Sequence, residues 1–265
     1  MGNHLHFSVS DGLAKIILDR PERKNAFTLE MIDAWNIALQ QCRENDQVKV
    51  VLVGGTGTAF CSGGDIVEMT ERVMQSPAQR KTELFERIQR IPLALENLDK
   101  PVIAVVNGVA TGAGLDLALM CDLRYAAASA RFAETYLNIG LVPGAGGAHY
   151  LPRLVGISKA LEMFFTRDFI DAREAEQVGL VNKVFPDEVL WQEVEKIAAR
   201  IAEAPQLALR MTKRAVYQSE RSDLRTNLDL ISSHYAVVTS SEDHRDAVGK
   251  FAANRSEKKR EKSRE

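Results

Sequence analysis

Short apolar runs alternate with amphipathic segments along the first half of the chain. The apolar runs Leu13–Leu18, Val48–Val53 and Pro101–Val106 each end in polar residues or glycine, as buried β-strands do. After the first run, Thr28 can cap a helix whose apolar residues recur at helical spacing from Met31 onward. Strands that alternate with helices in this way predict an α/β fold with mostly parallel strand pairing.

Later segments extend the same alternation. The charged, amphipathic segment Ile66–Ile91 predicts helices with a break near Ser76 and Pro77, because proline interrupts a helix. Further candidates are a buried helix at Leu115–Cys121 and short strands at Arg124–Ala128 and Val181–Phe185.

The pattern becomes almost wholly helical from Pro186 onward, with a break at Pro205. This shift predicts a core at residues 1–200 followed by a helical region at residues 201–265. The end of that region, Arg255–Glu265, is charged and has no apolar periodicity, so we expect it to be disordered.

Composition narrows the classes of protein that fit. A chain of 265 residues, 45% hydrophobic and 26% charged, can bury a core without a metal or a disulfide. A net charge of −2 predicts no nucleic-acid partner and no binding to an anionic membrane. The N-terminus has no apolar leader and no run reaches the length of a membrane span, so we predict neither export nor a spanning helix.

The cysteines are few and widely spaced. Cys42, Cys61 and Cys121 form neither a CxxC motif nor a cluster with histidine, which argues against a disulfide framework and a zinc site. We therefore expect no bound metal and a reducing, cytoplasmic setting.

Two glycine-containing segments follow predicted strands, at Phe60–Asp65 and Gly108–Asp116. Ligands collect at the carboxyl ends of parallel strands, where glycine lets the backbone approach them closely. The second segment precedes a helix, so its free N–H groups suit an oxyanion. Taken singly, each segment is also typical of a tight turn.

Two nucleotide motifs do not fit these segments. The run Gly112, Ala113, Gly114 begins like the dinucleotide fingerprint GxGxxG, but Leu117 replaces its third glycine. A phosphate-binding P-loop is also excluded, because no Gly-Lys-Ser/Thr follows a glycine-rich turn.

Four motifs in order give the chain, from Ser8 to about Lys250, a resemblance to the enoyl-CoA hydratase/isomerase (crotonase) family. They are Asp19–Ala26, Phe60–Asp65, Asn107–Asp122 and Gly140–Gly147. The resemblance implies a spiral of ββα turns in two nearly perpendicular sheets, with a C-terminal helical trimerisation region. It also implies an acyl-CoA thioester ligand, no separate cofactor because CoA is part of the substrate, and a homotrimer or a dimer of trimers.

The resemblance assigns roles to individual residues. It places an oxyanion hole at the backbone N–H groups of Gly64 and Ala113, which would bind the thioester oxygen as it gains charge. The residues that it places at CoA are Arg23, Lys24, Ala26, Cys61, Ser62, Asp65 and Gly112. Arg23 and Lys24 could pair with the phosphates, and are equally typical of solvated loop charges.

The chain departs from the family's hydratases at the two catalytic glutamates, where it carries Asp116 and Tyr136. Asp116 can move a proton, or can be a helix residue favoured by the dipole. Tyr136 is neutral at pH 7, so it is a proton donor or a pocket wall rather than a base. Glu134, two residues earlier, is not expected to share a direction with Tyr136, and His149 is expected to be structural.

Three functions fit these residues. The first is an enoyl-CoA hydratase/isomerase-like enzyme that acts through an enolate held by Gly64 and Ala113. The second is other enolate chemistry on an acyl-CoA, such as decarboxylation or C–C hydrolysis, for which one acid can suffice. The third is a relative that binds acyl-CoA without catalysis.

Overall fold

The chain divides into two compact units, residues 1–199 and residues 200–265. The structure is a computed structural model that describes residues 4–262.

The first unit contains a six-stranded sheet in the order β1-β2-β3-β5-β7-β10. Its strands are β1 (Leu5–Ser10), β2 (Leu13–Leu18), β3 (Val50–Gly55), β5 (Val102–Val106), β7 (Leu123–Ala127) and β10 (Lys183–Phe185). Only the β1–β2 pair is antiparallel, and the neighbouring pairs from β2 to β10 are parallel. The predicted α/β class with mostly parallel pairing is confirmed. β1 was not predicted, although its residues alternate between sheltered and exposed as a half-buried strand should.

A second sheet has four short strands in the order β4-β6-β8-β9. They are β4 (Ala59–Cys61), β6 (Val109–Thr111), β8 (Arg131–Ala133) and β9 (Ile170–Asp171). β4 pairs with β6 and β6 with β8 in parallel, so their carboxyl ends lie at one edge. β4 and β6 were not predicted, because the sequence indicated glycine-rich loops there. Three residues carry too little periodicity to predict a strand.

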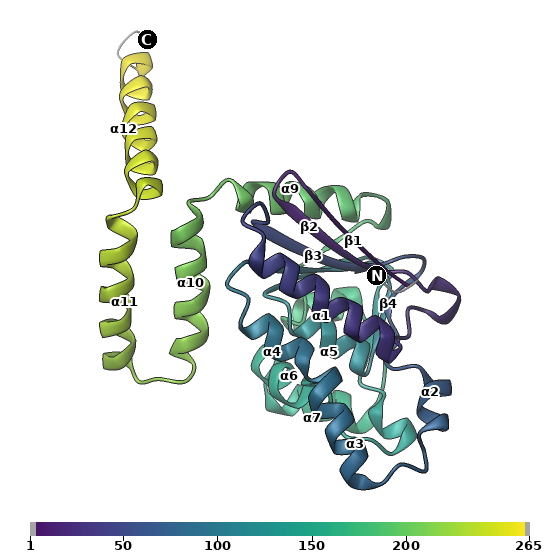
Figure 1. The fold of residues 1–265 in the computed structure, drawn as a ribbon. Helices are drawn as coiled ribbons and strands as arrows, with labels where there is room; N and C mark the ends of the chain where they lie inside the picture. Colours follow the sequence, from purple (N-terminus) through teal and green to yellow (C-terminus); the bar gives the residue numbers. More distant parts are fainter. Residues whose placement is uncertain (1–3, 263–265) are drawn as a thin grey trace. The chain divides into compact units, whose positions relative to one another are not determined.

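Helices surround the sheets of the first unit (Figure 1). They are α1 (Leu29–Glu44), α2 (Ile66–Glu71), α3 (Pro77–Glu83), α4 (Arg90–Glu96), α5 (Ala113–Leu119), α6 (Gly147–Val155), α7 (Ile157–Thr166), α8 (Ala172–Gln177) and α9 (Leu190–Ala202), which runs into the second unit; single turns are η1 (Pro21–Arg23), the π-helical η2 (Leu84–Ile88), η3 (Tyr136–Ile139) and η4 (Asp187–Val189). The Thr28 side chain caps α1 by accepting from the N–H of Met31 at 3.2 Å, as predicted. The predicted break also holds, since α3 begins at Pro77 with Ser76 and Gln79 forming a capping box.

The second unit is helical. It contains α10 (Gln206–Ser219), α11 (Leu224–Thr239) and α12 (Glu242–Lys262). α10 begins just after Pro205, so the predicted break is confirmed. α12 continues through residues 255–262, where the sequence indicated disorder; Lys, Arg and Glu are good helix formers and need no apolar face to continue a helix. Residues 263–265 of that predicted tail lie outside the described residues. No helix among residues 4–262 is long and apolar enough to cross a membrane.

Candidate active site

A pocket of about 370 Å³ opens in the first unit, where the chain leaves β4 and β6. Its walls are Arg23, Ala26, Ser62, Gly63, Gly64, Asp65, Ile66, Val67, Met69, Gly112, Ala113, Thr135, Tyr136, Asn138, Ile139 and Leu141. The two glycine-rich segments therefore line one cavity, as their positions after parallel strands predict.

Gly64 and Ala113 each present a backbone N–H that is not used by the fold. The backbone hydrogen bonds near Gly64 are made by its two neighbours. The N–H of Phe27 donates to Gly63 O at 2.8 Å, and the N–H of Asp65 donates to Phe27 O at 2.9 Å. Neither the N–H of Gly64 nor that of Ala113 has an acceptor among residues 4–262. Two such donors in one pocket can bind an oxygen that gains negative charge.

The two segments approach each other so closely that glycine is required. A Cβ on Gly114 would lie 2.2 Å from Cys61 O and 2.8 Å from the backbone nitrogen of Gly63. Thr111 adds a tie between the segments, since its hydroxyl donates to Ser62 O at 3.1 Å. The distance between the two unused N–H groups is thus set by backbone packing rather than by flexible side chains.

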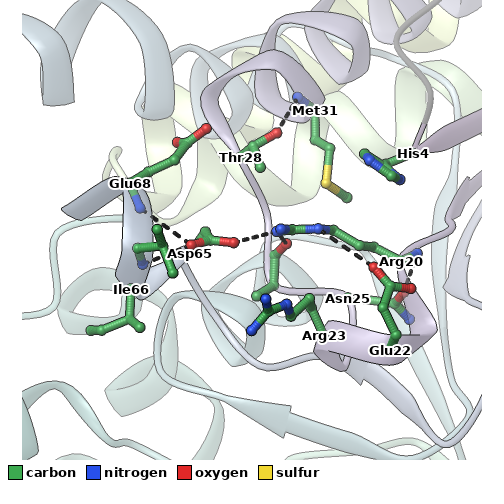
Figure 2. Close-up of polar contacts among 12 residues, drawn as sticks. His4, Arg20, Glu22, Arg23, Asn25, Thr28, Met31, Asp65, Ile66 and Glu68 are labelled. Carbon is green, nitrogen blue, oxygen red and sulfur yellow. Dashed lines mark hydrogen bonds and ion pairs between the residues drawn. The ribbon is translucent and has the colours of Figure 1, made fainter. Parts of the chain in front are cut away.

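Arg20 and Asp65 connect η1 to the first segment (Figure 2). The Arg20 guanidinium donates to the Asp65 carboxylate and to Ala26 O, the latter at 3.1 Å. Asp65 also caps α2, accepting from the N–H of Val67 at 2.7 Å and that of Glu68 at 3.2 Å. Burial raises the pKa of Asp65, but the Arg20 bond and these amides outweigh it and lower the pKa below its usual value. Asp65, for which the resemblance implies contact with CoA, lines the pocket, while its carboxylate is occupied in holding the segment.

Asn25 is a positioning residue whose part the sequence did not indicate. It is fully buried and adopts a positive φ of 54°. Its side-chain oxygen accepts from the N–H of Arg20 at 2.8 Å, and its amide donates to Thr56 O at 2.9 Å and Ala59 O at 2.8 Å. Asn25 therefore ties η1 to the start of β4. The sequence offered one weak indication of this role, because asparagine tolerates left-handed backbone better than most residues do.

Asp116 and Tyr136, which stand at the positions of the family's two catalytic glutamates, lie together. The Tyr136 hydroxyl donates to Asp116 Oδ2 at 2.5 Å. Tyr136 lines the pocket, whereas Asp116 is fully buried and does not. Burial raises the pKa of Asp116 to about 6, although the Tyr136 bond and the amides of Gly147 and Ala145 act in the opposite direction. Burial also raises the pKa of Tyr136, with the negative charge of Asp116 adding to the effect.

Glu134 joins this pair, contrary to the expectation that it would point elsewhere. Its side chain is fully buried and within hydrogen-bonding reach of Asp116. The expectation assumed regular strand or helix geometry, whereas Thr135, at φ −96° and ψ 5°, belongs to neither and joins β8 to η3. Burial, followed by the charge of Asp116, raises the pKa of Glu134 to about 10. Both effects favour the neutral form of Glu134.

Several residues considered from the sequence lie outside the pocket walls. Lys24 is exposed on the left-handed turn after η1, and Cys61 is fully buried, where burial raises its thiol pKa to about 12. His149 is exposed on α6 and packs edge-on against Tyr150. Among the side chains that the structure describes, those of residues 4–253 and 255, no group of three or more His, Cys, Asp or Glu could hold a metal ion.

Sequence comparison places the chain among known proteins over nearly its whole length. A family model described as enoyl-CoA hydratase/isomerase matches residues 8–261. The chain is 34% identical to a crotonyl-CoA hydratase from Syntrophomonas wolfei, covering 92% of each protein. It is also 34% identical to 1,2-epoxyphenylacetyl-CoA isomerase from Escherichia coli, covering 94% of this chain and 95% of the relative.

Solved structures agree with the sequence relatives. An enoyl-CoA hydratase structure from Mycobacterium smegmatis superposes with a TM-score of 0.89 at 32% identity, covering 96% of this chain and 97% of that one. An enoyl-CoA hydratase from Bacillus anthracis gives a TM-score of 0.87 at 32% identity, covering 95% of this chain and 97% of that one.

Proposed function

The chain belongs to the enoyl-CoA hydratase/isomerase family, and on that premise we propose that it is an enzyme that converts an enoyl-CoA thioester through an enolate intermediate. The enolate oxygen is bound by the N–H groups of Gly64 and Ala113. Asp116 and Tyr136 move the proton at the carbon beside the thioester carbonyl.

One observation carries this proposal: Gly64 and Ala113, whose N–H groups have no acceptor among the described residues, line the same pocket as Tyr136. An enolate gains its negative charge on oxygen and exchanges its proton at the adjacent carbon, so it needs donors and a proton carrier close together. Loss of one oxyanion donor typically costs about 10²–10³ in rate.

The remaining walls suit the rest of such a substrate. Ile66, Val67 and Met69 from α2 face the pocket together with Ile139 and Leu141 near η3, which favours an apolar acyl chain. Arg23 lies at the pocket and is exposed, with Lys24 beside it, so both cations can meet the CoA phosphates in solvent. Ala26, Ser62, Asp65 and Gly112 complete the proposed CoA contacts at the pocket walls, whereas Cys61 is fully buried and can contribute only from behind them.

Isomerisation suits this proton machinery better than hydration. Hydration needs one group to take a proton from water and another to deliver one to carbon. Among the described pocket walls, Tyr136 is the group placed to move a proton, since the Asp65 carboxylate is engaged by Arg20. A single carrier can remove a proton from one carbon and return it to another.

Two assays on the purified protein test the proposal. Crotonyl-CoA reports hydration through loss of the enone absorbance, and 3-butenoyl-CoA reports isomerisation through its appearance. We expect isomerisation to be faster, and calorimetry to give micromolar binding of butyryl-CoA, roughly −8 kcal/mol. A folded protein that binds no CoA ester would contradict the proposal, and hydration faster than isomerisation would contradict the assigned reaction.

A further inference from the structure

Three ionisable side chains from different parts of the fold meet behind the pocket wall. Asp116 comes from α5, Tyr136 from η3 and Glu134 from the segment between β8 and η3. Tyr136 lines the pocket, whereas Asp116 and Glu134 are fully buried behind it. A substrate in the pocket can therefore contact Tyr136 directly but not the two carboxyl groups, and the Tyr136 hydroxyl is bonded to Asp116.

The two carboxyl groups need a proton between them. Asp116 Oδ1 and both Glu134 oxygens are buried and have no hydrogen-bond donor among the described residues. Two carboxylates offer only acceptors, so their contact becomes a hydrogen bond when one of them is protonated. An unpaired buried charge is costly, which makes the doubly ionised state unfavourable.

Packing fixes the position of Asp116 Oδ1. A Cβ on Gly147 would lie 2.1 Å from this oxygen, so the backbone at the start of α6 presses against it. Tyr136 holds the other oxygen, Oδ2. The nearby amides of Gly147 and Ala145 also act on this carboxylate, but no described group makes a hydrogen bond to Oδ1, so Oδ1 can accept one from Glu134.

We propose that Glu134 is a positioning residue that stays protonated and donates a hydrogen bond to Asp116 Oδ1, so that Asp116 remains the anion that receives the substrate proton through Tyr136. This inference rests on the proposed enolate chemistry and adds a residue to it.

The proton transfer balances in charge. As the C–H bond beside the thioester carbonyl breaks, its electron pair enters the enolate. Tyr136 Oη binds the released proton while its own proton moves along the existing hydrogen bond to Asp116 Oδ2. Tyr136 and Asp116 end neutral, Glu134 is unchanged, and the negative charge has moved from Asp116 to the enolate oxygen at Gly64 and Ala113. The reverse transfer delivers the proton to carbon.

The surroundings support this assignment of protons. Among the described residues, Asp116 is the charged group that acts on Glu134, and with burial it raises the pKa of Glu134 to about 10. Asp116, with a pKa of about 6, is the one that ionises first. Of the ionisable side chains of the adjoining α6, His149 and Arg153 are exposed to solvent, and Tyr150 is half-buried and packs against His149.

Two substitutions separate hydrogen-bond donation from simple packing. Glu134→Gln keeps a donor of the same shape, so we expect kcat near that of the wild type at pH 7. Glu134→Leu removes the donor, so the acid limb of the kcat profile should move up by about one to two pH units, because a hydrogen bond to a charged group is lost. The wild type should also lose activity as Glu134 ionises near pH 10, and Glu134→Gln should not.

A structural carboxylate supplies the matched control. Asp122 accepts from the N–H of Val102 at 2.7 Å and does not line the pocket, so Asp122→Asn should lower the melting temperature without moving either limb of the pH profile. If Glu134→Leu behaves like Asp122→Asn, with unshifted limbs, Glu134 is a packing residue and the inference is overturned.

A measurement without turnover distinguishes this inference from the proposed function. The ¹³C carboxyl resonance of labelled Glu134, assigned by its absence in Glu134→Gln, should show a protonated group at pH 8. A Glu134 that ionises below pH 6 overturns the inference even in an active enzyme. A protonated Glu134 in a protein that converts no enoyl-CoA instead overturns the proposed function and the relay that depends on it.

Discussion

Asp116 shows at the scale of one residue how burial prepares a carboxyl group for proton transfer. Its side chain is fully buried, and burial is the largest influence on its pKa, which rises to about 6. The Tyr136 hydroxyl and the nearby amides of Gly147 and Ala145 limit that rise. Asp116 is therefore mostly ionised at pH 7 and still basic enough to accept a proton.

We expect Asp116→Asn to lower kcat by about 10²–10⁴ while KM changes little, because the amide keeps the shape but cannot exchange a proton. Steady-state kinetics with 3-butenoyl-CoA measures the loss, and calorimetry with butyryl-CoA checks that affinity is kept. Unchanged turnover in the folded variant would reduce Asp116 to a structural residue of α5.

At the scale of elements, the ends of β4 and β6 create the site because their backbones nearly touch. Gly114, at the start of α5, faces Cys61 O without room for a side chain. Arg20 and Asn25 hold η1 against the same region from the other side. The pair of N–H donors therefore depends on how two short strands end rather than on any single side chain.

Gly114→Ala tests this dependence. The added Cβ would lie 2.2 Å from Cys61 O, so the segments must separate, at a cost of about 1–3 kcal/mol in stability. We expect kcat/KM to fall at least about tenfold as the Ala113 N–H moves off its target. Gly249→Ala in α12 is the matched control, since its Cβ meets nothing within 4 Å. Equal kinetics in the two variants would contradict the argument.

At the scale of the whole molecule, the buried acids make stability depend on pH. The pKa of Glu134 is raised from 4.5 to about 10, so the folded state keeps a proton that the unfolded state releases above pH 4.5. The folded state then binds more protons, and the free energy of unfolding falls as pH rises through this window. Asp116 contributes in the same direction between its ordinary value of 3.8 and about 6.

Urea unfolding at pH 6, 7, 8 and 9 measures this effect. We expect the free energy of unfolding of the wild type to fall by up to about 1.4 kcal/mol per pH unit because of Glu134 alone. In Glu134→Gln this contribution to the slope should be absent. Other titrating groups are common to both proteins, so the difference in slope isolates Glu134. Parallel slopes would mean that Glu134 is ionised in the folded state.

Assembly is a second property of the whole molecule. Within the second unit, α11 leaves large apolar side chains in solvent, with Leu224 73%, Leu228 54% and Tyr235 70% exposed. Surfaces of this kind are usually covered by another subunit. The family resemblance leads us to predict a trimer or hexamer.

Sedimentation equilibrium at micromolar concentration should give three or six times the 29.4 kDa chain mass. Leu228→Glu should lower the measured mass if α11 is part of the interface. Asp229→Lys changes the charge at the neighbouring exposed position and tests whether a change of charge alone has the same effect. A wild-type mass of one chain would contradict the prediction.

The sequence by itself determined the features that local interactions control. The Thr28 cap, the breaks at Pro77 and Pro205, and the buried runs of β3 and β5 depend on side-chain chemistry and backbone geometry within a few residues. The glycine-rich segments were located for the same reason, because close backbone approach demands glycine wherever it occurs.

Only the tertiary structure decided how distant residues combine. The four short strands of the second sheet become strands by pairing across the chain, which no local period reveals. Glu134 and Asp116 stand eighteen positions apart, and the mutual effect on their pKa values follows from burial together in one low-dielectric space. The same holds for Arg20 and Asp65, whose ion pair shapes the pocket because folding brings η1 to the end of β4.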